Sequence, residues 1–395
     1  MAALAATGCT VAGHPGPVRV DAIALDTGAY GTDPLAAPTG SERYGRLLES
    51  VRMGEAMLDP VDADSALTHS TGGFTLTVVP TPAKATAMLS SAVREVLERN
   101  GLLAGAAVGG SDKECGRRGP VAGESRVLTV LALRFPDTDS AARAAREIDS
   151  ADAAVSAENV AVTIPDYPAA QAHWRPQVPT LAATLAHGPF VVSVLAGHTA
   201  TDLTVLTALA RTAFGLQLPL LDAFDPTPRD RIATLPLDPE GMLRLMVPEA
   251  PARWPYPGAT SLTGRQEAGW YNATHATGMT WGPRATGLIT GRRQDGPERL
   301  AFNGYNMLTR FPDAVAARRN HAAGLDRGLR EVPAPTGLPD TRCLEEIQPT
   351  GLGNNRYECW VLYGRYRAVV IGRDLANVRQ RTTAQYALLV NGYDL

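Results

Sequence analysis

A four-residue sequence, Arg-Phe-Pro-Asp, occurs twice in this chain, and the two copies are offset by 176 positions. The first copy is Arg134–Asp137 and the second is Arg310–Asp313. Further matches at the same offset pair Gly188 with Gly364, Phe190 with Tyr366, Val194 with Val370 and Leu195 with Ile371. Several matches at one constant offset are typical of an internal repeat. The sequence therefore predicts two diverged copies of one domain.

Each copy is expected to contain the same elements in the same order. A strand leads into Phe-Pro-Asp, whose aspartate is placed to cap a helix. A proline-rich crossing, two antiparallel strands joined at Gly188 or Gly364, and a last helix follow. The expected ranges are strands at 127–134 and 299–309, capped helices at 137–149 and 313–328, crossings at 165–179 and 333–339, and last helices at 199–214 and 374–390. This order predicts an α+β fold, with two tandem repeats of an antiparallel sheet packed on helices.

The repeat divides the chain into four expected parts. They are a lipobox and flexible linker at 1–20, an N-terminal α+β domain at 21–220, a connector at 221–240 and a C-terminal α+β domain at 241–395. The linker is expected because glycines and prolines between residues 13 and 17 prevent regular structure.

Composition narrows the class of protein. The 395 residues are 45% hydrophobic and 19% charged, which is usual for a globular protein. The net charge of −3 argues against nucleic acid as a partner. Since no long uninterrupted apolar run occurs, no transmembrane helix is expected in the mature chain. Lysine occurs only at Lys84 and Lys113, which with the abundant alanine indicates a GC-rich genome, such as that of an actinobacterium.

Cys9 ends the stretch Leu-Ala-Ala-Thr-Gly-Cys and is followed by the linker. Small residues before a cysteine are what a bacterial lipoprotein signal peptidase needs, because its narrow site cuts before a diacylated cysteine. We therefore expect acyl chains such as palmitate on Cys9, which would anchor the chain to membrane lipid. A secretory leader also needs a basic region and an apolar region. Only eight residues precede Cys9, none of them basic, so the start would lie upstream or the chain is trimmed. The alternative is a chance cysteine.

Three further cysteines are present. Cys343 and Cys359 flank the turn-rich segment Gly351–Asn355, which would fold two strands against each other. A disulfide between them would persist in an oxidising compartment and contribute on the order of 3 kcal/mol. The alternative is two buried thiols. Cys115 lies in a polar loop and is expected to be a free thiol.

No catalytic, cofactor or metal-ligand constellation is found in the sequence, so neither a cofactor nor a metal is expected. Asp26-Thr27-Gly28 resembles an aspartic protease motif, but that chemistry needs a second such aspartate and the sequence has none. Aromatic residues are dense between 254 and 281, a composition that lines ligand grooves and interfaces. The candidate binding residues are Trp254, Tyr256, Trp270, Tyr271 and Trp281. The alternative is that they form core and ordinary surface.

Taken with the repeated Arg-Phe-Pro-Asp, the stretch Val20–Tyr30 and the pair Arg52-Met53 resemble a two-domain family of secreted lipoproteins of unknown function from mycobacteria, nocardiae and rhodococci. The cysteine pair with Trp360 also resembles the extracellular sensor domain of mycobacterial Ser/Thr kinases. The first resemblance implies an envelope location and acylation at Cys9, and neither implies catalytic residues.

These features favour a non-enzymatic, lipid-anchored envelope protein on the extracytoplasmic face of the membrane. It would bind a ligand, or act as an accessory subunit of an integral membrane complex, through the cleft or face between its repeats. The alternative is a hydrolase or transferase of envelope polymers, with a site assembled from scattered residues.

Overall fold

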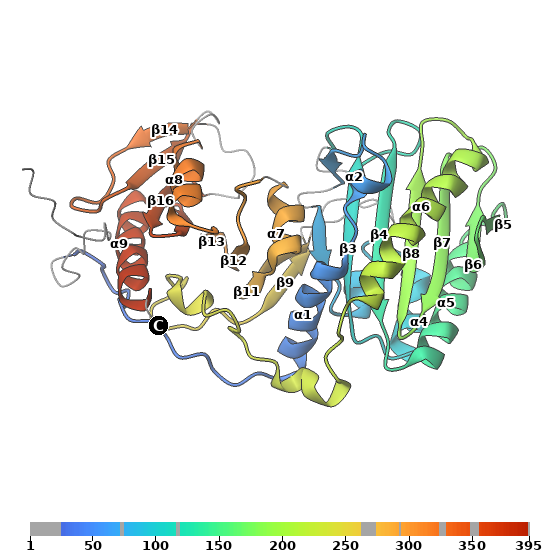
Figure 1. Ribbon diagram of the computed structural model, residues 1–395, viewed down its shortest axis with the longest axis horizontal. Coiled ribbons are helices and arrows are strands. Elements are labelled where there is room, and N and C mark those ends of the chain that lie inside the picture. Colours follow the sequence, from blue (N-terminus) through green and yellow to red (C-terminus); the bar gives the residue numbers. More distant parts are fainter. Residues whose placement is uncertain are drawn as a thin grey trace, which may run out of the picture.

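The computed structural model shows two sheet-and-helix halves side by side, joined by strands at the middle of the molecule (Figure 1). It describes residues 25–71, 75–115, 119–261, 274–291, 294–323, 329–347 and 355–393. Cys9 and the first five residues of the stretch Val20–Tyr30 lie outside these residues.

The N-terminal half is built on an antiparallel sheet of eight strands in the described residues, in the order β1-β3-β4-β8-β7-β6-β5, with β2 also paired to β3. Its strands are β1 (His69–Ser70), β2 (Leu76–Val78), β3 (Ala104–Ser111), β4 (Val127–Arg134), β5 (Val160–Ile164), β6 (Tyr167–Trp174), β7 (Thr180–His187) and β8 (Phe190–Gly197). Its α-helices are α1 (Glu42–Met53), α2 (Pro60–Ala63), α3 (Pro82–Ala85), α4 (Arg94–Arg99), α5 (Thr138–Ala153) and α6 (Leu203–Asp222). Helices α4 and α5 cover one face of the sheet and α6 covers the other (Figure 1).

The C-terminal half repeats this arrangement, with seven strands in the part of it that the structure describes, in the order β11-β12-β13-β17-β16-β15-β14. Its strands are β11 (Met279–Trp281), β12 (Arg299–Asn303), β13 (Asn306–Arg310), β14 (Leu329–Val332), β15 (Thr341–Glu346), β16 (Tyr357–Tyr363) and β17 (Tyr366–Gly372). Its helices are α7 (Pro283–Thr290), α8 (Ala314–Ala322) and α9 (Leu375–Gly392), and β9 (Gly258–Ser261) and β10 (Thr274–Thr277) form a separate hairpin. The predicted α+β fold, with two tandem antiparallel sheets packed on helices, is confirmed.

The repeated Arg-Phe-Pro-Asp has the same structural role in both halves. Phe135 and Phe311 are buried in the core, at 0% and 1% exposure. Each following aspartate caps a helix: Asp137 accepts the backbone N–H of Ser140 at 2.7 Å, and Asp313 accepts that of Ala316 at 2.8 Å. The bond from Ser140 lowers the pKa of Asp137, because it stabilises the carboxylate. The motif therefore marks the start of α5 and of α8.

The turn glycines at the same offset also behave alike. Gly188 and Gly364 have φ angles of 53° and 54°, in the left-handed region that favours glycine. Each occupies a two-residue turn, between β7 and β8 or between β16 and β17. These matches therefore reflect one repeated hairpin.

Two of the expected segments form other elements than predicted. The first proline-rich crossing instead contains the turn of the β5–β6 hairpin, at Asp166 with a φ of 65°, and the whole of β6. Pro168 is tolerated in β6 because it lies at the start of the strand, beside a register shift after Val162. The strand expected at 299–309 is two strands, since Gly304-Tyr305 forms a tight turn between them.

The two halves share one hydrophobic core, which extends from the N-terminal sheet through β11 to α9. Where they meet, the Glu55 carboxylate of the 3-10 helix η2 (Gly54–Ala56) caps α7. It accepts the backbone N–H groups of Arg284 and Ala285 at 3.1 and 2.9 Å. A Cβ at Gly282 would lie 2.6 Å from the Glu55 Cδ, so a larger residue there would displace the capping carboxylate. The contact ties the halves together.

Candidate functional site

Helices α6 and α9 are equivalent in the two repeats, and a buried glutamine on each establishes their register. Gln217 of α6 accepts the Leu58 N–H at 3.1 Å and donates to the Ala56 carbonyl at 2.5 Å. Gln385 of α9 accepts the Val247 N–H at 2.9 Å and donates to the Leu245 carbonyl at 2.6 Å. The two contacts match atom for atom, so residue n of α6 corresponds to residue n + 168 of α9.

The outer face of α9 is covered by residues 25–35, which we call the strap. Figure 1 shows the strap running down beside α9 before it crosses to α1. Polar side chains of α9 hold it: Gln380 donates to Asp26 at 3.1 Å, Asn377 to the Tyr30 hydroxyl at 3.3 Å and Asn391 to the Thr32 carbonyl at 2.8 Å. With the sheet on one side and the strap on the other, residues 381–390 of α9 are all buried.

The equivalent face of α6 has a different chemistry. Asn377, Gln380, Ala384, Leu388 and Asn391 of α9 correspond to Leu209, Thr212, Leu216, Leu220 and Ala223 of α6. We call these five residues, four of α6 and its C-cap Ala223, the α6 face. Its three leucines are only partly buried, and its threonine and alanine are exposed. The hydrogen-bonding groups that hold the strap on α9 are therefore replaced by apolar or small side chains on α6.

The apolar character of α6 extends along the whole helix. Val205, one turn before the α6 face, is 39% exposed. Among the described helices, α6 alone is long and apolar enough to meet the length and composition of a membrane span, with a mean hydropathy of 1.3 and 33% of the window buried. It packs on β7 and β8, however, as a helix of the folded domain. Helix α6 therefore presents an unusually apolar side to the surface.

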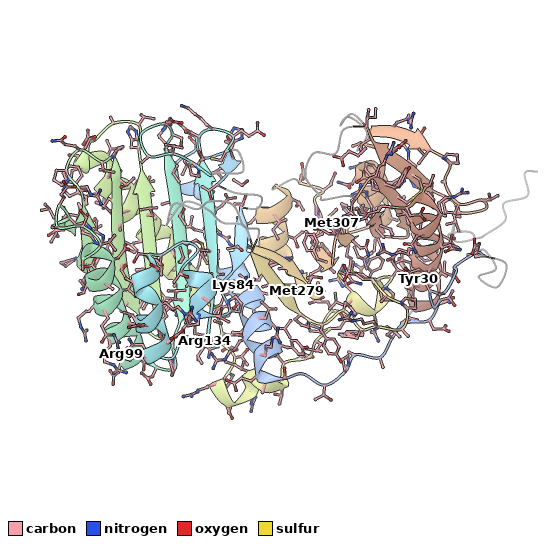
Figure 2. All side chains as sticks on the ribbon, turned by 180° about the vertical axis from the view of Figure 1, so that it is seen from behind. Tyr30, Lys84, Arg99, Arg134, Met279 and Met307 are labelled. Carbon is pink, nitrogen blue, oxygen red and sulfur yellow. A yellow bond between two sulfur atoms is a disulfide. The ribbon has the colours of Figure 1, made fainter. Side chains whose placement is uncertain are left out.

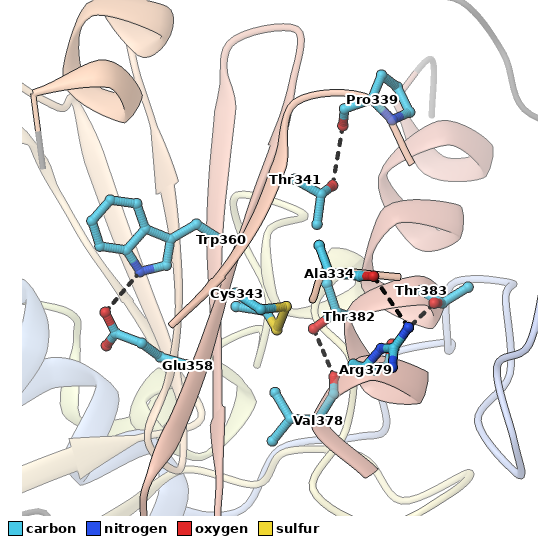
Figure 3. Close-up of a disulfide and its surroundings, with 11 residues drawn as sticks. Ala334, Pro339, Thr341, Cys343, Glu358, Trp360, Val378, Arg379, Thr382 and Thr383 are labelled. Carbon is cyan, nitrogen blue, oxygen red and sulfur yellow. Dashed lines mark hydrogen bonds between the residues drawn. A yellow bond between two sulfur atoms is a disulfide. The ribbon is translucent and has the colours of Figure 1, made fainter. Parts of the chain in front are cut away.

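The predicted disulfide is present, between Cys343 of β15 and Cys359 of β16 (Figure 3). The two cysteines are directly opposite in the antiparallel ladder and are almost fully buried. They belong to one buried cluster with Val370 of the C-terminal sheet and Val378 of α9. The bond therefore fixes the part of the sheet on which α9 and the strap rest.

Comparisons with known proteins match both halves separately. A family model described as the N-terminal domain of unknown function DUF7373 matches residues 36–237, and the corresponding C-terminal model matches residues 242–392. The chain belongs to the DUF7373 family. The expected membership of a two-domain family of unknown function is therefore confirmed. No curated protein matches the chain.

One solved structure similar to this DUF7373 chain is the extracellular domain of PknH from Mycobacterium tuberculosis. It shares 14% sequence identity and a TM-score of 0.27, over 47% of this chain and 98% of that one. A TM-score of this size does not establish a common fold.

The structure separates the aromatic residues proposed from the sequence. Trp254 and Trp281 are buried in the core shared by the halves of this DUF7373 protein, at 7% and 2% exposure. Tyr256 is 43% exposed and stacks on Tyr44 of α1, with ring centroids 5.2 Å apart. Trp270 and Tyr271 lie outside the described residues. Burial means that the two tryptophans pack the junction of the halves and do not line an open groove.

Other polar groups of the DUF7373 chain form local pairs. Cys115 is a partly buried free thiol whose Sγ lies 3.4 Å from the Lys113 carbonyl, and burial raises the pKa of this thiol. Asp26, of the protease-like motif, accepts the N–H of Gly28 in a turn at the start of the strap. In the described ranges no group of three His, Cys, Asp or Glu residues is arranged to hold a metal. A shallow depression of about 370 Å³ lies beside β14 and β15.

Sequence reasoning missed the α6 face and the glutamine pair. The glutamines lie 168 residues apart, and the loops that they hold lie 189 residues apart, so neither shares the 176-residue offset of the motif. A search for Gln within an apolar helix of each repeat would have found the pair. The strap had no signal in the sequence, because its contacts join residues about 350 positions apart, such as Asp26 and Gln380.

Proposed function

We propose that this chain is a lipid-tethered protein of the extracytoplasmic membrane face, and that it binds an integral membrane protein complex through the α6 face. The observation that carries the proposal is the difference between two equivalent helices. A polypeptide segment covers α9, whereas the same positions of α6 are apolar and partly exposed. The proposed occupant of the α6 face is an apolar polypeptide segment of the partner.

The energetics of the α6 face suit such an occupant. Leu209, Leu216 and Leu220 lie along one side of the helix, and completing their burial would contribute on the order of 1 kcal/mol each. Thr212 and Ala223 are small, which would allow a partner backbone to approach the helix closely. Leu209, Thr212 and Ala223 stand where α9 has two asparagines and a glutamine. The partner segment therefore needs few polar groups facing α6.

Two further features support the proposed extracytoplasmic location. The Cys343–Cys359 disulfide is of the kind that persists in oxidising surroundings. Cys9 follows small residues as a lipoprotein acylation site does, and it precedes the strap by a short glycine- and proline-rich stretch.

Acylation of Cys9 has a direct test. Mass spectrometry of the protein isolated from its own membrane is expected to show an N-terminal cysteine carrying two or three acyl chains. Cys9→Ser is expected to remove the adduct and to release the protein from the membrane. A native N-terminus that retains Met1 with an unmodified Cys9 would contradict the tether.

The α6 face is tested by adding charge where the helix is exposed. Thr212→Arg places a guanidinium at the centre of the face, where folding does not require threonine because the side chain is exposed. A complex isolated in mild detergent is expected to lose its partner with this variant. Val315→Arg, at a position of α8 that is 58% exposed, is the matched control and is expected to retain the partner. Equal retention by both variants would reject the α6 face.

A further inference from the structure

The two repeats carry opposite net charges. Residues 36–237 contain 17 lysines and arginines against 22 acidic residues, a net charge of −5. Residues 242–392 contain 19 arginines against 12 acidic residues, a net charge of +7. The overall charge of −3 conceals this division, since it sums the two halves. Two copies of one fold thus present different electrostatic surfaces, which is a feature of chains that orient toward a charged partner.

The positive charge is concentrated in the elements that carry the strap. Residues 355–393, which form β16, β17 and α9, contain six arginines and two acidic residues. At one end of the sheet, Arg330 and Arg356 both pair with Glu345, the latter at 2.5 Å. Glu345 is only 5% exposed, whereas the two arginine side chains are 65% and 57% exposed. The carboxylate therefore lies beneath the guanidinium groups, and positive charge faces the solvent.

The same end of the molecule receives the strap. The Arg356 N–H donates to the Gly372 carbonyl, so Arg356 adjoins the end of β17, where the exposed Arg373 follows. Helix α9 begins directly afterwards, and its Gln380 holds Asp26 at the beginning of the strap. Figure 2 places Tyr30 of the strap in the C-terminal half, and Arg134 in the other half. The chain leading from Cys9 thus reaches the body of the protein at its basic half.

We infer that the C-terminal repeat lies against the membrane and binds its anionic headgroups, with Arg330, Arg356 and Arg373 in the contact. This inference rests on the proposed function, because a tether at Cys9 is what brings this end of the molecule to the bilayer. The acidic N-terminal repeat is repelled by the same surface, so it lies farther from the bilayer, and its α6 face would meet a part of the membrane complex that projects from the bilayer. An acyl tether alone leaves the body free to rotate, whereas a tether with a basic surface sets its orientation.

Vesicle binding by the full chain with Cys9→Ser tests the inference without acylation. The protein is expected to sediment with vesicles of phosphatidylcholine and phosphatidylglycerol, to remain free with phosphatidylcholine alone, and to dissociate at high ionic strength. The double variant Arg356→Ala with Arg373→Ala is expected to bind about thirtyfold more weakly, at about 1 kcal/mol per arginine. The control removes two exposed arginines of the acidic repeat, Arg43→Ala with Arg146→Ala, and is expected to bind as the parent does.

Several results would overturn the inference: equal binding to neutral and anionic vesicles, no binding to either, or equal losses in the two double variants. Binding to a soluble polyanion such as dextran sulfate, without sedimentation on anionic vesicles, would show that the ligand is an anionic polymer and not the bilayer. Circular dichroism of each variant shows whether it is folded. If the double substitution destabilises the sheet, Arg373→Ala alone is used in the binding assay. Failure here leaves the acyl adduct on Cys9 unaffected, so the two claims are judged separately.

Discussion

Replacing Arg134 with methionine is expected to lower the free energy of unfolding by about 3 kcal/mol. Arg134 pairs with Glu49, and the two side chains are 7% and 0% exposed. Without Arg134 the buried Glu49 carboxylate retains Arg52 at 2.6 Å and the Thr227 hydroxyl at 2.6 Å, but it loses its most buried counter-charge. A carboxylate in the protein interior is costly when its charge is not balanced. The loss is measured by chemical denaturation followed by circular dichroism.

The internal repeat supplies a matched control for this variant. Arg310 is the equivalent residue, and it pairs with Glu240 at 3.1 Å with the side chains 15% and 33% exposed. Because water screens this pair, Arg310→Met is expected to cost about 1 kcal/mol or less. Equal losses at the two positions would contradict the view that burial, and not the motif itself, determines the effect.

Loss of the disulfide is the second large effect. Cys343→Ala with Cys359→Ala is expected to lower the free energy of unfolding by roughly 3 kcal/mol, as loop-closure entropy predicts for a bridge spanning 16 residues. Alanine is used because a serine hydroxyl would be buried among Val370, Val378 and Leu388. Reductant is expected to lower the thermal midpoint of the parent protein and leave that of the double variant unchanged.

Cys115→Ala is the control for the disulfide variant. Its thiol is unbridged, so the substitution is expected to leave both the thermal midpoint and its response to reductant as in the parent. A double variant as stable as the parent would show that the bridge does not form.

Local sequence signals predicted the repeated parts of the fold well. Asp137 and Asp313 cap helices, and Gly188 and Gly364 turn hairpins, because each of these roles depends on a few neighbouring residues. The second capped helix was expected to reach residue 328, but α8 ends at Ala322. The N-terminal cap of α8 depends on neighbouring residues, whereas the length of the helix depends on packing against the sheet.

Features that depend on distant contacts could not be predicted in this way. The α6 face is recognised only after α6 is placed on α9, and that requires the contacts of Gln217 with Ala56 and Leu58. The strap packs on a helix at the opposite end of the chain, so no local pattern in residues 25–35 indicates it. The charge division, in contrast, could have been counted from the sequence with the predicted domain boundaries.

The measurement that tests the proposed function most directly is site-specific photocrosslinking in the native membrane. A benzophenone side chain at position 212 would lie on the α6 face, and one at position 315 would lie on exposed α8. The α6 face as a partner-binding surface predicts one discrete crosslinked membrane protein from position 212, and no such product from position 315. No product from position 212, or the same products from both positions, would contradict it.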